Sequence, residues 1–492
     1  MTANVLDEYR TRRAKLDDIR NQGTNPYPER FDRSHSLAKA KVAAMGKTVR
    51  VAGRIMTIRD MGKIVFCHIQ DETGRLQLAF REDEVGKNRL KWFVKYVDPA
   101  DFVGVRGKMF KTQRGEVSVM VKEFQLLSKA LRPLPEKWHG LHDQESLYRQ
   151  RYLDLVSNPE TLDRFKFRSD LIKLLREFYW KEGFTEVETP VLTNTPSGAL
   201  AKPFRTHHNA LGTDIYLRIA LETYLKESVV GGFEKVFEIG RCFRNEGIDP
   251  SHLQDFTMLE HYAAYWNFED NMKFTEKMLT FVLKKICKTL KVEIKNRDGK
   301  LMMVDFKAPW PRASFHELIK RDSGIDINEC ATADELRKAI NGKKIEIEDS
   351  SSLGRGNLID AIYKKVSRPK IVHPTFVIHH PIDVSPLARR NDVRQDIVDR
   401  FQLVVNGWEI INAYSELVDP VDQSERFASQ ASERAAGDEE AHVKDDEFVR
   451  ALEHGAPPIS GWGMGIDRLV AILTKQDNLR DVVLFPLLRP EQ

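Results

Sequence analysis

The sequence predicts an α+β protein with a small N-terminal β-barrel and a larger second domain of mixed strands and helices. Two observations carry this prediction. Short alternating apolar runs crowd into residues 48–130, and strand and helix patterns then alternate to the end of the chain. The 492 residues, 41% hydrophobic and 30% charged, are too many for one ordinary core and favour two or three folded units.

The N-terminal part begins with a polar segment, residues 1–47, whose sparse apolar positions predict a peripheral helical element. From residue 49 the pattern changes to short alternating runs, which predict strands at 49–55, 64–69, 76–80, 102–105 and 117–121. About five strands in so short a stretch are typical of a small barrel. An OB-fold over residues 48–130 is the natural candidate.

A boundary follows the barrel at Pro133-Leu134-Pro135, and residues 131–160 are interpreted as a linker. The second domain is expected over residues 161–492. It opens with an amphipathic helix, since apolar residues recur at helical spacing from Leu171 to Phe178. Residues from about 312 to 375 have the pattern of a mainly helical insertion.

Composition excludes several classes of protein. No stretch approaches the roughly 20 apolar residues of a membrane helix, and the N-terminus has no apolar signal core, so a cytoplasmic protein is expected. The cysteines lie far apart and none forms a CxxC pair, which argues against a disulfide framework or a zinc ribbon. They are Cys67, Cys242, Cys287 and Cys330.

Charge is distributed unevenly along the chain. Residues 1–130 contain 26 Lys+Arg and 16 Asp+Glu, a net +10, which leaves 51 and 57, a net −6, for the remainder. A basic N-terminal part suits a polyanion such as RNA. A solvated surface with chance asymmetry is an equally good reading of charge alone.

A long-looped hairpin is predicted in the second domain, with strands at 236–244 and 256–262 joined by a polar loop. Because strand side chains alternate, one face carries an aromatic ring, an acid and a phenol. Its members are Phe256, Met258, Glu260 and Tyr262, approached from the strand end and loop by Arg244, Glu246 and His252. An ordinary sheet with a partly polar face is the alternative.

A second strand, 410–416, places Asn412, Tyr414 and Glu416 on one face. Two acids would then meet in one sheet. Such carboxylates must be hydrated, protonated or matched to a cation such as an ammonium group or a metal. Glu409 is out of phase with this face and needs a bulge or the start of the strand to reach it.

A glycine-rich turn, residues 461–465, precedes an apolar helix. Glycines permit close backbone approach, a helix N-terminus favours phosphate, and Arg468 supplies a positive fork. Such turns are also common packing devices, and the strict GxGxxG and GxxxxGK[ST] signatures are absent.

Three blocks resemble the motifs of class II aminoacyl-tRNA synthetases. Residues 184–190 (FTEVETP) resemble motif 1, 243–247 (FRNEG) motif 2 and 463–469 (GMGIDRL) motif 3. The similarity is greatest to the bacterial-type lysyl-tRNA synthetases. It extends through 148–155, 206–211 and 385–390, and so covers almost the whole chain. The resemblance implies an antiparallel class II catalytic sheet flanked by helices after the OB-fold barrel.

The resemblance implies an ATP site with three catalytic residues, Arg244, Glu409 and Arg468. Arg244 would hold the α-phosphate and the amino-acid carboxylate, which suits a bidentate cation. Phe256 would stack beneath the adenine and Arg468 would cover its other face. Glu246 would contact the adenine amino group, and His252 would reach the γ-phosphate.

The implied lysine pocket contains Gly198, Glu222, Glu260, Tyr262, Asn412, Tyr414, Glu416 and Gly465. By similarity Glu222 meets the α-ammonium, while Glu416 and Tyr262 meet the ε-ammonium. A buried lysine side chain does need a carboxylate and further acceptors. Tyr414 stands where the family usually has phenylalanine.

The resemblance also implies Mg²⁺, a homodimer and tRNA. The metal site would consist of Glu409 and Gln402, where Gln402 replaces a glutamate usual in the family and should weaken the site. The dimer would form through motif 1 near Pro190. In the barrel, Phe66, Gln77 and Glu116 would read the anticodon of tRNA(Lys) by stacking and polar contacts.

Two rival functions stay open at the level of sequence. A lysyltransferase that modifies a protein would be expected to lack the N-terminal barrel, as the short relatives that act on elongation factor P do. A catalytically inactive tRNA-binding paralogue is disfavoured by the intact Arg244, Glu409 and Arg468. The expected substrates are therefore L-lysine, ATP and tRNA(Lys).

Overall fold

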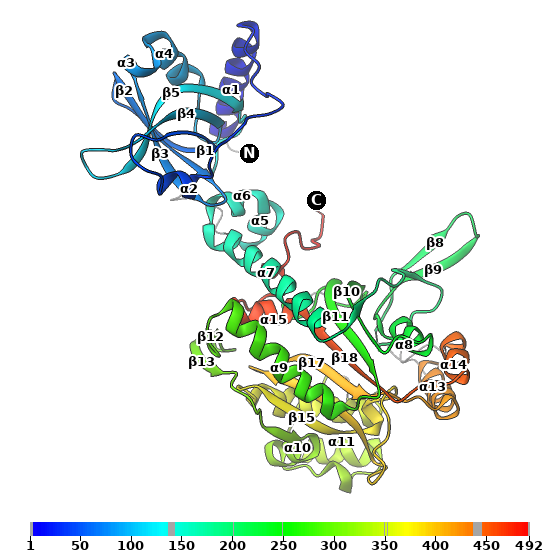
Figure 1. The fold of residues 1–492 in the computed structure, drawn as a ribbon. Coiled ribbons are helices and arrows are strands. Elements are labelled where there is room, and N and C mark those ends of the chain that lie inside the picture. The colour runs from blue at the N-terminus through cyan, green and yellow to red at the C-terminus, as the bar shows by residue number, and fades with distance from the viewer. Residues whose placement is uncertain are drawn as a thin grey trace. The chain divides into compact units, whose positions relative to one another are not determined.

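A computed structural model describes residues 3–135, 143–199, 201–247, 249–348, 350–351, 353–435 and 445–490. The chain divides into two compact units, Met1–Leu147 and Tyr148–Gln492 (Figure 1). This division falls inside residues 131–160, the expected linker, of which 136–142 lie outside the described residues. Two short helices occupy the end of that range, α5 (Gln144–Arg149) and α6 (Arg151–Ser157).

The first unit is built around a closed five-stranded barrel, as the alternating runs predict. Its strands follow the order β1-β2-β3-β5-β4. They are β1 (Thr48–Asp60), β2 (Ile64–Asp71), β3 (Gly74–Arg81), β4 (Phe102–Lys111) and β5 (Val117–Ser128). The helices are α1 (Ala3–Asn21), α2 (Leu37–Lys41), α3 (Glu82–Val85) and α4 (Lys87–Tyr96). The N-terminal helix predicted within residues 1–47 is α1.

Buried and more exposed side chains alternate along β1 and β2, which gives the barrel an apolar interior. In β2 the side chains of Val65, Cys67 and Ile69 are buried, while Phe66 and His68 alternate outward and are half-buried. Close approach of β4 and β5 requires a glycine at position 107, because a Cβ there would collide with the carbonyl oxygen of Met120. The outer face of β2 is therefore available for a ligand.

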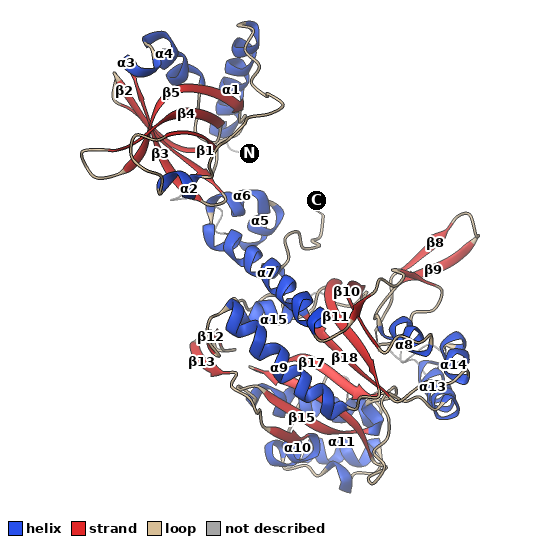
Figure 2. Cartoon of the chain, in the orientation of Figure 1, coloured by secondary structure: helices blue, strands red, loops and turns tan. Residues whose placement is uncertain are grey.

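The second unit contains an eight-stranded sheet in the order β14-β15-β16-β17-β18-β11-β10-β6 (Figure 2). Its strands are β6 (Thr185–Glu186), β10 (Lys235–Phe243), β11 (Asp255–Ala264), β14 (Arg312–Ser314), β15 (Thr375–Pro381), β16 (Ile397–Val405), β17 (Trp408–Ser415) and β18 (Ile459–Gly465). Neighbours are antiparallel except for the outermost pair at each edge. The predicted class II sheet is thus confirmed.

Three helices cover one face of this sheet, namely α7 (Pro159–Lys181), α9 (Phe268–Ile286) and α15 (Ile466–Leu473). Leu175 of α7, Met278 of α9 and Leu469 of α15 are buried in one cluster with Leu259 and Ala413 of the sheet. The helix α9 begins at a capping box, in which Asn267 and Asp270 satisfy each other's backbone N–H groups. The opposite face of the central strands is left for the pocket described below.

The remaining elements surround the sheet. A separate apolar cluster joins α10 (Phe315–Ser323), α11 (Ala333–Gly342) and α12 (Arg355–Ile362) within the region expected to be a helical insertion. Further helices are α8 (Glu222–Val230), α13 (Pro420–Ala435) and α14 (Asp446–Glu453). Two small sheets consist of β12 (Lys291–Lys295) with β13 (Leu301–Asp305), and of β7 (Leu192–Thr193), β9 (Thr213–Leu217) and β8 (Arg205–His208).

The fold bears on two features that the composition argues against, a membrane helix and a disulfide framework. No helix in the described part of the chain is long and apolar enough to cross a membrane. All four cysteines are free, three of them are buried and Cys287 is partly buried. Burial raises the pKa of Cys242 to about 12, so this thiol is not a nucleophile at neutral pH.

Candidate active site

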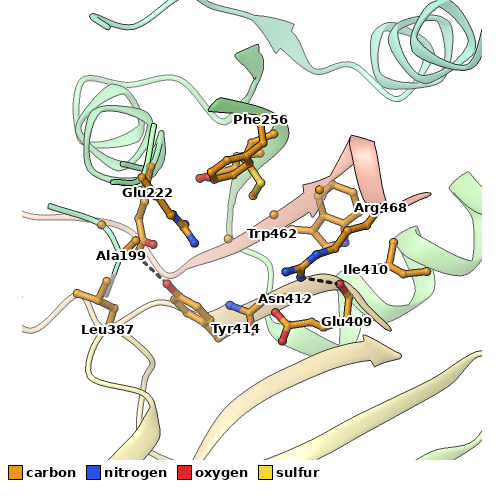
Figure 3. Close-up of a pocket in the computed structure, with 18 of the residues that line it drawn as sticks. Ala199, Glu222, Phe256, Leu387, Glu409, Ile410, Asn412, Tyr414, Trp462 and Arg468 are labelled. Atoms are coloured by element: carbon orange, nitrogen blue, oxygen red, sulfur yellow. Dashed lines mark hydrogen bonds between the residues drawn. The ribbon is translucent and has the colours of Figure 1, made fainter. Parts of the chain in front are cut away.

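A pocket of about 310 Å³ opens on the sheet face that faces away from α9 and α15. Its floor comes from the strands β11, β17 and β18, and its walls come from the loops after β7 and β10 and from residues 384–388. Figure 3 shows Glu222 and Tyr414 facing one another at one end and Arg468 beside Glu409 at the other, with Asn412 between them. The pocket therefore has two chemically different ends.

The predicted hairpin is present as β10 and β11, and in its register Phe243 pairs with Asp255 and Val236 with Tyr262. Alternation then sends one set of β11 side chains to the pocket and the other set to the helical side. The pocket-facing set is Phe256, Met258, Glu260 and Tyr262. The predicted shared face is confirmed.

The strand β17 contributes Asn412 and Tyr414 to the same pocket. A register shift between Leu403 and Val404 of β16 pairs Val404 with Glu409 and so turns this out-of-phase acid toward the pocket. The irregularity that the sequence requires for Glu409 is present. Arg400 of β16 orients the amide of Asn412, since its Nε lies 2.9 Å from Asn412 Oδ1.

The cationic end of the pocket is formed by Arg244, His252 and Arg468. The Arg244 guanidinium lies 5.0 Å from the ring centroid of Phe256, a cation–π contact. Arg468 Nη1 donates to the Glu409 carbonyl oxygen at 3.0 Å, and burial lowers the pKa of Arg468. The ring of His252 is oriented by the Asp249 carboxylate, 2.7 Å from its Nδ1. Two guanidinium groups and an imidazole N–H suit a polyphosphate.

The anionic end is formed by Glu222 and Glu260. Glu222 begins α8, and its Oε1 accepts a hydrogen bond from the Tyr414 hydroxyl at 2.7 Å. Burial and the neighbouring Glu222 charge raise the pKa of Glu260 to about 8. Glu222 also pairs with Lys226. A cationic ligand beside Glu260 would stabilise its ionised form, which favours a cation at this end of the pocket.

A potential cation site lies near Glu409. Gln402 Nε2 donates to Glu409 Oε2 at 2.9 Å, while Gln402 Oε1 is buried without a hydrogen-bond partner. Within the described ranges no group of three or more His, Cys, Asp and Glu residues could hold a metal by itself. The Glu409 carboxylate, which lines the pocket, fits an ion whose other ligands are phosphate oxygens and water, whereas Gln402 turns its amide N–H toward Glu409 and does not line the pocket.

The chain matches known protein families over most of its length. Residues 143–489 match the family of class II tRNA synthetases (D, K and N), and residues 49–127 match an OB-fold nucleic acid binding domain. The chain is 46% identical to the lysine--tRNA ligase of Pelotomaculum thermopropionicum over 98% of this chain and 95% of that protein. It is 44% identical to that of Thermotoga maritima over 99% and 97% of the two chains.

This chain belongs to the class II lysyl-tRNA synthetase family.

Within this family framework, the pocket brings most of the residues predicted for the site together. Those that line it are Gly198, Glu222, Arg244, Glu246, His252, Phe256, Glu260, Tyr262, Glu409, Asn412, Tyr414, Gly465 and Arg468. Two predicted residues do not line it, because Gln402 and Glu416 are buried behind its wall at 6% and 2% exposure. Glu416 instead forms an ion pair with Lys226.

The three residues predicted to read the anticodon lie together on the outer barrel face. Gln77 Nε2 donates to Glu116 Oε2 at 2.8 Å, and Phe66 is two residues before His68, which pairs with Gln77 across β2 and β3. His68 Nε2 lies 2.8 Å from Glu116 Oε1 and was missed by the sequence analysis. Its position two residues after Phe66 on the same strand could have indicated it.

Two further residues of the catalytic unit were missed. Lys226 is four residues after Glu222, a spacing that places both side chains on one face of α8, and this signal was readable in the sequence. Arg400 carries no such signal. It reaches the site only because β16 pairs with β17 and aligns Arg400 with Tyr414.

Proposed function

We propose that this chain ligates L-lysine to tRNA(Lys) in two steps at this pocket, first forming lysyl-adenylate from lysine and ATP. The observation that carries the proposal is that the guanidinium groups of Arg244 and Arg468 and the carboxyl groups of Glu222 and Glu260 line one pocket, with Glu222 and Arg468 toward opposite ends. ATP is a polyanion, while lysine carries two ammonium groups and one carboxylate. Each substrate therefore has a complementary end, and the lysine carboxylate and the ATP α-phosphate meet between them.

In the first step the lysine carboxylate attacks the α-phosphorus, and pyrophosphate leaves with the electrons of the broken P–O bond. Arg244 holds both reacting anions, which reduces their repulsion and aligns them. In the second step a terminal ribose hydroxyl of tRNA attacks the lysyl carbonyl and AMP leaves. No protein nucleophile takes part, because positioning and charge neutralisation suffice.

Mg²⁺ would be held by Glu409 together with the phosphates, where it neutralises charge on the leaving group. Gln402 orients the Glu409 carboxylate through its amide N–H, and its Oε1 is buried outside the pocket lining. Arg468 fixes the start of β17 through the carbonyl oxygen of Glu409. These contacts support an assignment of Glu409 as the principal protein ligand of the ion.

Replacing Gln402 by glutamate is expected to lower, by several-fold, the Mg²⁺ concentration that gives half-maximal lysine-dependent ATP–pyrophosphate exchange. The physical reason is that a second carboxylate beside Glu409 is a stronger ligand for a hard cation than an amide. Lysine affinity should not change. Gln423→Glu is the control, because Gln423 is also buried but its amide has no hydrogen-bond partner among the described residues, whereas the Gln402 amide contacts Glu409. If the Mg²⁺ concentration for half-maximal exchange is unchanged in a folded, active Gln402→Glu enzyme, Gln402 has only a packing role.

The barrel would bind the anticodon of tRNA(Lys), with Phe66 stacking on a base and the Gln77–Glu116 pair contacting base edges. The exposed edge of this cluster and its fixed hydrogen bonds support the proposal.

Phe66→Ala is expected to weaken tRNA binding by about 1 to 3 kcal/mol, the value of one base–aromatic stack, and to leave lysyl-adenylate formation intact. Filter binding and exchange assays on the same preparation separate these effects. Tyr27→Ala removes an exposed aromatic ring elsewhere in the unit and serves as the control. An equal loss of both activities would argue against base stacking at Phe66.

We further infer a homodimer through the motif 1 segment and a place in the cytoplasm, where tRNA is charged. Exposed apolar side chains around the short edge strand β6 support the dimer, since Trp180, Val191 and Leu192 are between 41% and 57% exposed.

The proposed function is tested by incubating the full chain with ATP, Mg²⁺, labelled lysine and tRNA. The label should enter the tRNA fraction and be released by ribonuclease and by mild base. A label that instead becomes attached to an added protein acceptor, with none on RNA, would favour the rival protein lysyltransferase.

A further inference from the structure

A resident ammonium group lies behind the anionic end of the pocket. Lys226 of α8 is 1% exposed, and its Nζ lies 2.5 Å from Glu222 Oε1 and forms an ion pair with Glu416 Oε2. Three aromatic rings surround this ammonium, those of Tyr262, Tyr414 and Phe448, with centroids 5.9, 5.7 and 5.5 Å from Nζ. A buried cation with two carboxylates and three rings is a built feature.

Lys226 engages only one oxygen of Glu416. The other oxygen, Oε1, is buried and has no hydrogen-bond partner. It lies directly against the backbone of Gly461, where a Cβ would collide with it, and Gly461 lines the pocket. The absence of a side chain at Gly461 therefore leaves Oε1 close to the pocket interior. Glu416 has one oxygen for Lys226 and one to offer to a ligand.

Burial and the neighbouring acids disfavour the ionised form of Glu416, and Lys226 favours it. Burial raises the pKa of Glu416, and the charge of Lys226 is the largest influence that lowers it. The carboxylates of Glu222 and Glu260 raise it further. The phenols of Tyr262 and Tyr414 face the same cluster, and their pKa values are raised well above the usual range by burial, so they stay neutral.

Lys226 itself stays charged in this cluster. Burial acts to lower its pKa, but the charges and hydrogen bonds of Glu222 and Glu416 outweigh burial, and the net pKa is raised. The pair is thus mutually dependent, and the loss of either charge leaves the other buried without a partner.

We propose that Lys226 is a positioning residue for substrate selection, which holds Glu416 by one oxygen as a charged acceptor so that its free oxygen receives the ε-ammonium of lysine. This inference rests on the assignment of the anionic end to lysine. It explains how a carboxylate that does not line the pocket can still select an amine-terminated side chain. A protonated Glu416 would lose the charge that distinguishes lysine from a neutral side chain of similar length.

The test is the pH dependence of lysine affinity, measured by calorimetry from pH 6 to pH 8.5 on the full-length enzyme. In Lys226→Met the pKa of Glu416 rises further, so at a given low pH its ionised fraction falls by about tenfold for each unit by which the pKa rises. Lysine affinity should be lost at pH 6, recover as the pH rises, and follow a steeper slope than in the native enzyme. Affinity for ATP should not change, and Lys226→Arg should restore the native slope.

One control variant and a comparison of pH slopes separate this role from general destabilisation. Lys129→Met removes another buried lysine, which pairs with Asp98 and Asp101 in the barrel, and should leave the slope unchanged. Glu260, whose pKa is about 8, titrates in native and variant enzymes alike, so the difference between slopes is the readout. A native slope in folded Lys226→Met would overturn the proposal.

A double variant covers the case in which Lys226→Met fails to fold. Lys226→Met combined with Glu416→Gln removes both charges, and its lysine affinity should be within about a factor of three of that of Glu416→Gln alone, a difference of about 0.7 kcal/mol. A much larger additional loss would show that Lys226 does not act through Glu416. If Glu416→Gln itself leaves lysine affinity unchanged, Glu416 does not receive the ε-ammonium and the proposal fails, while the assignment of the anionic end to lysine through Glu222 and Glu260 still stands.

Discussion

Arg244→Ala is expected to lower the rate of lysine-dependent ATP–pyrophosphate exchange by about 10²- to 10³-fold, which corresponds to roughly 2.7 to 4 kcal/mol of transition-state stabilisation. Arg244 lies at the cationic end of the pocket, where negative charge accumulates as the carboxylate approaches the α-phosphate. The guanidinium group of Arg244, held in place before the reaction, would stabilise the transition state more than the bound substrates. The effect should therefore appear mainly in kcat.

The measurement compares kcat and KM of three variants by the same exchange assay. Arg244→Lys keeps the charge but loses the bidentate geometry, and should recover only part of the rate. Arg241→Ala is the matched control, because Arg241 lies three residues earlier, on β10, but pairs with Asp255 and does not line the pocket. A loss confined to KM for ATP would mean that Arg244 contributes only ground-state binding.

Glu416→Gln is expected to weaken lysine binding by about 2 to 4 kcal/mol while ATP binding is preserved. The substitution keeps the size of the side chain and removes the charge that faces both Lys226 and the proposed ε-ammonium. It also leaves Lys226 with Glu222 as its remaining partner. Calorimetric titration with lysine, and separately with ATP, measures the two affinities.

Glu238→Gln provides the comparison for Glu416→Gln. Glu238 is about as buried as Glu416, but its ion-pair partner is Arg218, at 2.8 Å, and not Lys226. Its loss should lower stability without changing the ratio of lysine to ATP affinity. If the two variants have the same effect on lysine binding, the charge of Glu416 has no specific role in selecting lysine.

Strand periodicity predicted the parts of the site that lie on regular strands. The face of Phe256, Glu260 and Tyr262 followed from alternation along β11, and the requirement for an irregularity at Glu409 followed from its phase. Both predictions are confirmed because hydrogen-bonded strands fix side-chain direction with a period of two. The barrel was predictable for the same reason.

The environment of Glu416 was not predictable from that periodicity. The strand β17 ends at Ser415, and Glu416 beyond it makes an isolated bridge to Ala388 and a backbone hydrogen bond to Ile459, so its side chain is set by tertiary packing. Its partner Lys226 comes from a helix about 190 residues earlier in the chain. Similarly, the contact of Gln402 with Glu409 depends on the register of two strands, which composition does not determine.

The central claim, that the pocket activates lysine, is tested most directly by ATP–pyrophosphate exchange with each of the twenty amino acids added singly to the full-length enzyme. The account predicts exchange that depends on lysine and on Mg²⁺ and that proceeds without tRNA. Exchange driven equally well by another amino acid, or the absence of exchange with lysine in a folded protein that binds ATP, would contradict it.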